Sequence, residues 1–344
     1  VFTAEQVKRY ALAEKTFDKP VIIVTQAEAE IAEKGFSTKK KTWKFKAENV
    51  RDFGISTSRK FILDAMAVQM SEKTAMAISL YPKEGNPLWE EYSTRAVAHT
   101  LKSYSSYTFD YPYPKAVSVS AQDQGMEYPM ICWNFGRPEA DGTYSDRVKY
   151  GMLGVIIHEV GHNYFPMIVN SDERQWTWMD EGLNTFMEFL AESTFDPNFP
   201  LDRGPAATIV PYMSGDQKFL EPIMSNSEGI IQFGNNAYGK PAAGLNIMRE
   251  IIMGHELFDY SFKVYANRWK FKHPTPEDFF RTMEDASAVD LDWFVRGWFY
   301  TTDFTDIGIK EVKQFYVVNE KPTDAKKVVS NRRNRLNTSG AMVY

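Results

Sequence analysis

One short run of residues limits what this chain of 344 residues can fold into. His158 and His162 lie four residues apart with Glu159 between them, a spacing that puts both imidazoles on one face of a helix. Two imidazoles one turn apart can reach one tetrahedral metal ion, and the glutamate faces the ion's open side. Glu181, nineteen residues after His162, is the candidate third ligand at the start of another helix. The sequence therefore predicts two helices that fold back on each other around one zinc ion.

The chemistry expected of such a site is hydrolysis. Three protein ligands are typical of catalytic zinc sites, because they leave the fourth position open for water. Zinc lowers the pKa of that water toward about 7, so we expect Glu159 to act as the general base and then protonate the leaving amine. A tyrosine hydroxyl could hold the oxyanion, but the chain's 18 tyrosines leave the choice open. The alternative is a surface helix with two solvated histidines, since unrelated proteins also contain this pentapeptide.

Composition argues against several other classes of protein. Apolar residues make up 43% of the chain, enough for a sizeable core, and a net charge of −5 without a basic block argues against nucleic-acid binding. Cys132 is the only cysteine, so an intrachain disulfide scaffold is excluded. No apolar run approaches the roughly 18 residues that span a membrane. Residues 1–5 show neither an initiator methionine nor a signal peptide, so we expect a fragment of a longer protein, with compartment and oligomeric state left open.

Residue patterning predicts an α+β chain that is mainly helical. Alternating or β-branched runs indicate strands at residues 21–25, 42–46, 61–68, 75–80, 117–121, 126–131, 307–309 and 315–318. Helical spacing indicates helices at residues 5–19, 28–34, 88–104, 146–166, 176–194, 238–254, 258–269, 275–288 and 291–300. Asp180 is expected to help cap the helix that carries Glu181. Pro129 removes a ladder donor, so the strand around it is expected at a sheet edge, where an extended peptide could pair.

Several motifs together resemble the gluzincin zinc aminopeptidases, the metallopeptidase family 1 that includes aminopeptidase N and the leukotriene hydrolases. The pentapeptide from His158 to His162, eighteen residues and then Glu181 look like the zinc signature of that family. The family's Gly-x-Met-Glu-Asn segment is similar to Gly125-Met126-Glu127-Tyr128-Pro129. Residues 237–245 resemble its Tyr-Glu-Lys-Gly-Ala segment, and the likeness covers roughly residues 45–305.

This resemblance implies a thermolysin-like catalytic domain, with a mixed-sheet upper lobe, a helical lower lobe and one Zn²⁺ between them. The implied zinc ligands are His158, His162 and Glu181. Glu159 would be the general base that activates the water, and Tyr238 would stabilise the oxyanion. The implied function is a zinc-dependent aminopeptidase, a hydrolase that cuts the N-terminal peptide bond of peptides with a free N-terminus.

The segment before the zinc helix is implied to bind substrate. Glu127 would hold the free α-amine, with Gly125 and Met126 beside the substrate backbone. Tyr128 stands where the family has asparagine, and the family's large N-terminal β domain is nearly absent. We therefore expect a remnant of that domain at residues 1–55, a catalytic domain at 56–305, and a β segment with a tail at 306–344. The alternatives are a zinc endopeptidase or epoxide hydrolase on the same scaffold, or a non-catalytic binding module.

Overall fold

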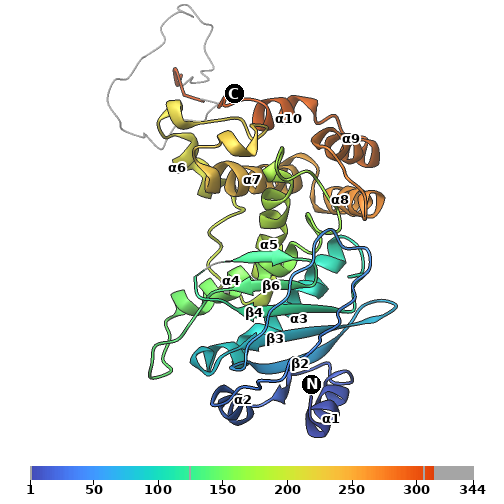
Figure 1. Cartoon of the computed structure of the whole chain (residues 1–344). Coiled ribbons are helices and arrows are strands. Elements are labelled where there is room, and N and C mark those ends of the chain that lie inside the picture. The colour runs from blue at the N-terminus through green and yellow to red at the C-terminus, as the bar shows by residue number, and fades with distance from the viewer. Residues whose placement is uncertain (1, 124, 305–306, 314–344) are drawn as a thin grey trace, which may run out of the picture. The chain divides into compact units, whose positions relative to one another are not determined.

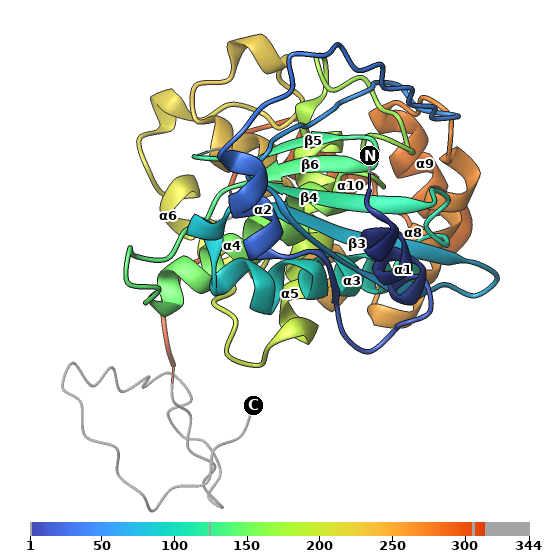
Figure 2. The ribbon, with the colours of Figure 1, turned by 60° about the horizontal axis from the view of Figure 1, so that its bottom comes forward.

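A mixed six-stranded sheet forms one side of the main folded unit, which comprises residues up to Asp303 (Figure 1). The computed structural model describes residues 2–123, 125–304 and 307–313. The strands are β1 (Val21–Val24), β2 (Ile62–Gln69), β3 (Thr74–Tyr81), β4 (Lys115–Ser120), β5 (Met126–Tyr128) and β6 (Ile131–Asn134). Their order across the sheet is β1-β2-β3-β4-β6-β5, and Figure 2 shows β5, β6, β4 and β3 side by side. Only β4 pairs in parallel, with β3 and with β6, while the other pairs are antiparallel.

Three helices pack on the sheet and on one another, and two of them carry the candidate zinc ligands. Helix α3 (Leu88–Tyr107) packs on β2, β3 and β4, and α4 (Asp146–Gly161) packs on α3 and β6. Helix α5 (Glu181–Phe195) follows a short 3₁₀ turn and packs on α4 and α3. Because α4 lies between sheet and helices, almost all of its last two turns is buried, which removes the motif from bulk water.

The rest of the main unit is largely helical. It contains α6 (Val210–Met213), α7 (Lys240–Ile247), α8 (His255–Trp269), α9 (Pro276–Ser287) and α10 (Asp292–Phe299), with π-helical turns at Gly234–Gly239 and Met248–Ile252. Aromatic side chains fill the space between α5, α8 and α9, among them Phe186, Phe258, Phe262 and Phe279. Such rings bury large apolar areas and dominate a core of this kind. At the other end, α1 (Ala4–Ala13) and α2 (Gln26–Glu33) each begin with a threonine capping box.

The structure confirms an α+β fold in which helix predominates over strand, and it confirms a mixed sheet with β5 at its edge. The predicted strand at residues 42–46 is wrong: this segment has no regular structure, and Trp43, 60% exposed, stacks on Phe45. The strand predicted at 307–309 is also wrong, and Ile309 is 84% exposed. Residues 315–318 lie outside the described residues. None of the described helices is long and apolar enough to cross a membrane.

The domain boundaries at residues 55 and 305 stay predictions. Strand β1, which precedes the first boundary, pairs with β2, which follows it. The contacts between residues divide the chain into two units, residues 1–303 and residues 304–344.

A chain of buried hydroxyl groups crosses the interface between α3 and the sheet, and it ends at a buried carboxyl group. Asp64 on β2 is 1% exposed and accepts hydrogen bonds from Tyr81 Oη, at 2.5 Å, and from Thr94 Oγ1. Thr94 Oγ1 also contacts Ser79 Oγ at 2.6 Å, and Ser79 Oγ contacts Ser93 Oγ at 2.7 Å. Burial raises the pKa of Asp64 to about 7, although the hydroxyl groups of Thr94 and Tyr81 oppose this.

We expect Asp64 to make the folded state less stable as pH rises. The pKa in the unfolded chain is about 3.9, so the native state holds the proton over a range where the unfolded state has lost it. Its contribution is therefore intact below about pH 4 and lost as pH rises to about 7. Relative to Asp64→Asn, the wild type should lose about 3 kcal/mol of unfolding free energy between pH 4.5 and pH 8, measured by urea denaturation. Asp18→Asn, at an exposed carboxylate, is the control, and equal pH profiles for wild type and Asp64→Asn would disprove the effect.

Candidate active site

Helix α4 brings both motif histidines to its C-terminal end. The helix begins at Asp146, after the N-cap Ser145 whose side chain accepts from Val148 N, and ends at Gly161, with His162 as the C-cap. An apolar face, including Ile156, Ile157 and Val160, is fully buried and fixes the rotation of the helix. His158 and His162 are therefore held on the face turned toward α5, as their spacing predicts.

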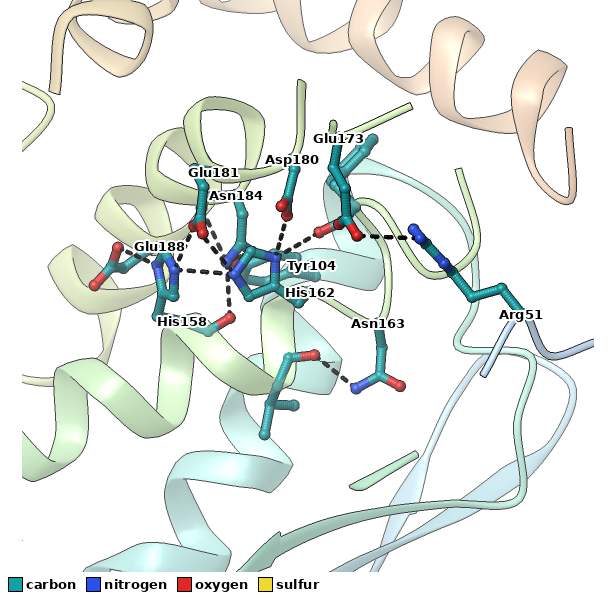
Figure 3. A network of polar contacts seen from close by, with 12 residues as sticks. Arg51, Tyr104, His158, His162, Asn163, Glu173, Asp180, Glu181, Asn184 and Glu188 are labelled. Carbon is teal, nitrogen blue, oxygen red and sulfur yellow. Dashed lines mark hydrogen bonds and ion pairs between the residues drawn. The ribbon is translucent and has the colours of Figure 1, made fainter. Parts of the chain in front are cut away.

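Two hydrogen bonds of Asn184 hold α5 in place close to the histidines, one to α4 and one to α3. Asn184 Nδ2 donates to His158 O at 2.8 Å, and Tyr104 Oη donates to Asn184 Oδ1 at 2.9 Å. A Cβ on Gly161 would collide with both Tyr104 Oη and Asn184 Oδ1, so only glycine fits there. These contacts place Glu181, the first residue of α5, beside the two imidazoles (Figure 3).

Three ligand-type atoms converge at this point. His158 Nε2 and His162 Nε2 lie 3.0 Å apart, and Glu181 Oε2 lies 3.1 and 3.3 Å from them, respectively. These three residues could hold a metal ion. Although burial lowers the pKa of His158, the carboxylates of Glu188 and Glu181 raise it to about 10. The surroundings thus stabilise positive charge at this position.

The outer nitrogens of both histidines face acceptors. His158 Nδ1 lies 2.9 Å from Glu188 Oε2, and His162 Nδ1 lies 2.9 Å from both Phe165 O and Asp180 Oδ1. Carbonyl and carboxylate oxygens only accept, so each Nδ1 carries a hydrogen, and an imidazole that loses its other proton when a metal ion binds has its lone pair on Nε2. Two such lone pairs and a carboxylate oxygen directed at one point fit a cation between them.

Two of these supporting residues were not identified correctly from the sequence. Asp180 was expected to cap α5, but its side chain makes no cap hydrogen bond and contacts His162 instead. Glu188 was not predicted at all. It follows Glu181 by seven residues, two helical turns, and this spacing was the available signal that it shares a face with the ligand.

Glu159 lies buried next to the three ligand atoms, on the side of the edge strand. A Cβ on Gly125 would collide with Glu159 Oε1, so the glycine allows the substrate-binding segment to approach the carboxylate closely. Glu159 Oε2 is buried and has no hydrogen-bond partner among the residues that the structure describes. Burial raises the pKa of the Glu159 carboxyl group to about 7, against the opposing effect of the two histidines.

Tyr238 lies on the π-helical turn Gly234–Gly239, and its ring stacks on that of His158 with centroids 5.7 Å apart. Single π-helical turns inside α-helices often occur at functional sites. Burial and the nearby Glu181 carboxylate raise the pKa of the Tyr238 hydroxyl above its ordinary value. The hydroxyl is therefore a protonated donor at any ordinary pH.

The remaining predicted residues lie on the edge strand β5 and just before it. The Glu127 carboxylate forms a cluster with His162 and Asp180, with one ligand-type atom of each within 4.8 Å of the others. The side chain of Met126 is exposed. Tyr128 packs edge-on against Trp133, with ring centroids 5.6 Å apart, so the residue that replaces the family's asparagine has a packing contact.

A cleft of about 1020 Å³ opens from the site between α4, α5 and the loop after α5. Its walls include His158, Glu159, Tyr238 and Gly125, so it can admit a substrate to the residues described above. A second, more apolar hollow of about 660 Å³ lies under residues 45–56 and is lined by none of the predicted site residues.

Comparisons with known proteins agree with this arrangement. The family model described as "Peptidase family M1 domain" matches residues 92–298. "Aminopeptidase 2, mitochondrial" of Saccharomyces cerevisiae is 22% identical over 264 residues, which is 73% of this chain and 28% of that protein. "Endoplasmic reticulum aminopeptidase 1" of Mus musculus is 21% identical over 241 residues, which is 67% of this chain and 26% of that protein. The chain thus spans little more than a quarter of the length of these curated relatives.

Solved structures show the same fold. An M1 zinc metallopeptidase from Deinococcus radiodurans superposes with a TM-score of 0.54 at 16% identity, over 71% of this chain and 53% of that one. Aminopeptidase A of Legionella pneumophila, solved with aspartic acid, superposes with a TM-score of 0.54 at 16% identity, over 70% of this chain and 28% of that one. Since the family model covers more than half of the 344 residues, the protein belongs to peptidase family M1.

Proposed function

We propose that the protein is a zinc aminopeptidase, which hydrolyses the peptide bond that follows the N-terminal residue of a peptide. The observation that carries this proposal is the convergence of His158 Nε2, His162 Nε2 and Glu181 Oε2 beside the buried Glu159 carboxylate. The aminopeptidases among its relatives, and the zinc metallopeptidases that share its fold, support the same reading.

His158, His162 and Glu181 would hold one zinc ion. A bound zinc ion would supply Lewis-acid chemistry, which acidifies water and polarises the scissile carbonyl group. Glu188 and Asp180 would orient the two imidazoles through their Nδ1 atoms, as outer carboxylates do in histidine metal sites.

Glu159 would be the general base. Burial raises the pKa of its carboxyl group toward neutral pH, which makes the carboxylate a stronger base than an ordinary glutamate. It would remove the proton of the attacking water and then deliver a proton to the nitrogen of the leaving amine. Its position beside Gly125 places it next to the edge strand, where the substrate backbone would lie.

Tyr238 would donate its hydroxyl hydrogen to the oxygen that becomes negatively charged during the reaction. Stacking on His158 would keep the ring in place. Glu127 would bind the α-ammonium group of the substrate, with Gly125 and Met126 along its backbone. A carboxylate near His162 would set a fixed distance between that ammonium group and the reacting carbonyl. Cleavage would therefore fall after the first residue of the peptide.

The test compares a tripeptide that has a free N-terminus with its N-acetylated form, using the full chain supplied with zinc. We expect kcat/KM to be at least about 100-fold higher for the free tripeptide, because acetylation removes the charge that Glu127 would bind. Glu127→Gln should lower kcat/KM for the free peptide by about 10- to 100-fold, as expected for the loss of a charge-assisted hydrogen bond.

Glu139→Gln, at an exposed glutamate on a nearby loop, is the matched control and should leave both rates unchanged. Equal rates on free and acetylated peptides would point to an endopeptidase instead. An equal loss on both peptides in Glu127→Gln would remove Glu127 from amine binding.

A further inference from the structure

The two ends of a bound peptide would meet different surroundings. Glu127 clusters with His162, whereas the large cleft is lined by His158, Glu159 and Tyr238. If the α-amine binds at Glu127, the first residue occupies the His162 side of the site. The chain after the scissile bond then runs past His158 into the cleft, so the wall of the cleft contacts the second residue of the substrate.

Two glutamates of α5 form part of that wall. Glu188 and Glu192 lie one turn apart on the same face of the helix, and both line the cleft. Glu188 Oε2 contacts His158 Nδ1, which leaves Glu188 Oε1 available. A carbon atom built as a Cβ on Gly154 would lie 3.1 Å from Glu192 Oε1 and 3.9 Å from Glu188 Oε1. Both oxygens therefore face the same space beside Gly154.

Glu192 is an unusual residue for such a position. It is 8% exposed, and in the described part of the chain no hydrogen bond or ion pair reaches its carboxylate. Burial, with a further contribution from Glu188, raises the pKa of Glu192 to about 9, although the charges of His158 and Arg203 oppose this. A buried carboxyl group without a partner is unfavourable, and a cation placed beside it would offset that cost.

None of the other charged groups that line the cleft forms an ion pair with Glu192 in the described part of the chain. Arg147 and Arg203 line the cleft but are exposed to solvent, where salt screens their charge. Arg203 lies over the ring of Tyr238, 4.8 Å from its centroid. Asp202 adds a further negative charge to the cleft. Apart from His158, the buried or half-buried charged groups of the wall are thus carboxyl groups, while the two arginines lie at its rim.

We propose that Glu192, together with Glu188, forms a recognition site for a basic side chain, so that the enzyme prefers peptides with lysine or arginine directly after the N-terminal residue. This proposal rests on the proposed aminopeptidase function, which sets the direction of the peptide.

The experiment compares Ala-Lys-Ala with Ala-norleucine-Ala, whose second side chain has the same four carbons but no ammonium group. We expect kcat/KM for the zinc-supplied wild type to be about 10-fold or more higher for the lysine peptide. Glu192→Gln, which keeps the shape of the side chain, should reduce that ratio to about 3 or less. Glu256→Gln, at an exposed glutamate of α8, is the matched control and should keep the wild-type ratio.

A binding measurement separates failure of this site from failure of the proposed function. Glu159→Gln supplied with zinc should bind Ala-Lys-Ala about 10-fold more tightly than the norleucine peptide by calorimetry. If wild type hydrolyses both peptides equally, or prefers Ala-Glu-Ala, the lysine site is wrong while the aminopeptidase function stands. If no peptide is hydrolysed but the binding preference remains, the proposed function fails and the recognition site stands. Equal binding without hydrolysis overturns both.

Discussion

Glu159→Gln is expected to lower kcat for hydrolysis of the N-terminal peptide bond by about 10³-fold or more. Glutamine keeps the size of the side chain and its contact with Gly125, but it cannot accept the proton of the attacking water. Glu159 supplies none of the three converging ligand atoms, so zinc content should stay at that of the wild type. The rate is measured with a free tripeptide, and the metal by mass spectrometry of the dialysed protein.

Asp146→Asn, in the first turn of the same helix, serves as the control for this variant. It should change kcat by less than about 2-fold, since an exposed carboxylate in a first turn affects helix stability by only about 0.3–1 kcal/mol. If Glu159→Gln keeps more than a tenth of the wild-type kcat, another group takes the proton and Glu159 is not the general base.

Tyr238→Phe is expected to lower kcat by about 10²- to 10³-fold with little change in KM. Phenylalanine preserves the ring, so its stacking on His158 and the π-helical turn should persist. The change removes a hydroxyl donor that would strengthen its bond only as charge develops on the substrate oxygen, so the loss should fall on kcat. Steady-state kinetics over a wide concentration range separate the two constants.

Tyr260→Phe removes a hydroxyl from an exposed tyrosine on α8 and should leave both constants unchanged. A Tyr238→Phe variant with normal kcat would mean that another group stabilises the oxyanion. A large rise in KM with normal kcat would instead assign the hydroxyl to substrate binding.

The elements that carry the site could be predicted because their signals are local. Spacing of four places His158 and His162 on one helical face, and Glu181 begins the next long helix, as expected. The strand predicted at residues 42–46 is absent, because a strand depends on non-local pairing as well as on its local sequence. Alternating Trp43 and Phe45 is compatible with a strand, but strand formation also needs a neighbour to pair with, which a local pattern cannot reveal.

Residues around the ligands were harder to predict, because their directions depend on tertiary packing. Asp180 immediately precedes Glu181, yet it follows a 3₁₀ turn that directs its carboxylate to His162 and not to the helix end. Glu188 and Glu192 share a helical face with Glu181, but only the fold of α5 against α4 shows that this face borders the cleft. The roles of Glu159, Tyr238 and Glu127 stay predictions until the variants are measured.

The hydrogen bonds by which Asn184 joins α5 to α4 and α3 have a consequence for metal exchange. Asn184 connects His158 O to Tyr104 Oη, and neither hydrogen bond uses a ligand atom. In a zinc finger the binding energy of the ion drives folding, but here ordinary hydrogen bonds and packing already align the two helices. Little reorganisation is then required for loading, so the free energy of metal binding is available as affinity, and a chelated sample should regain its ion without refolding.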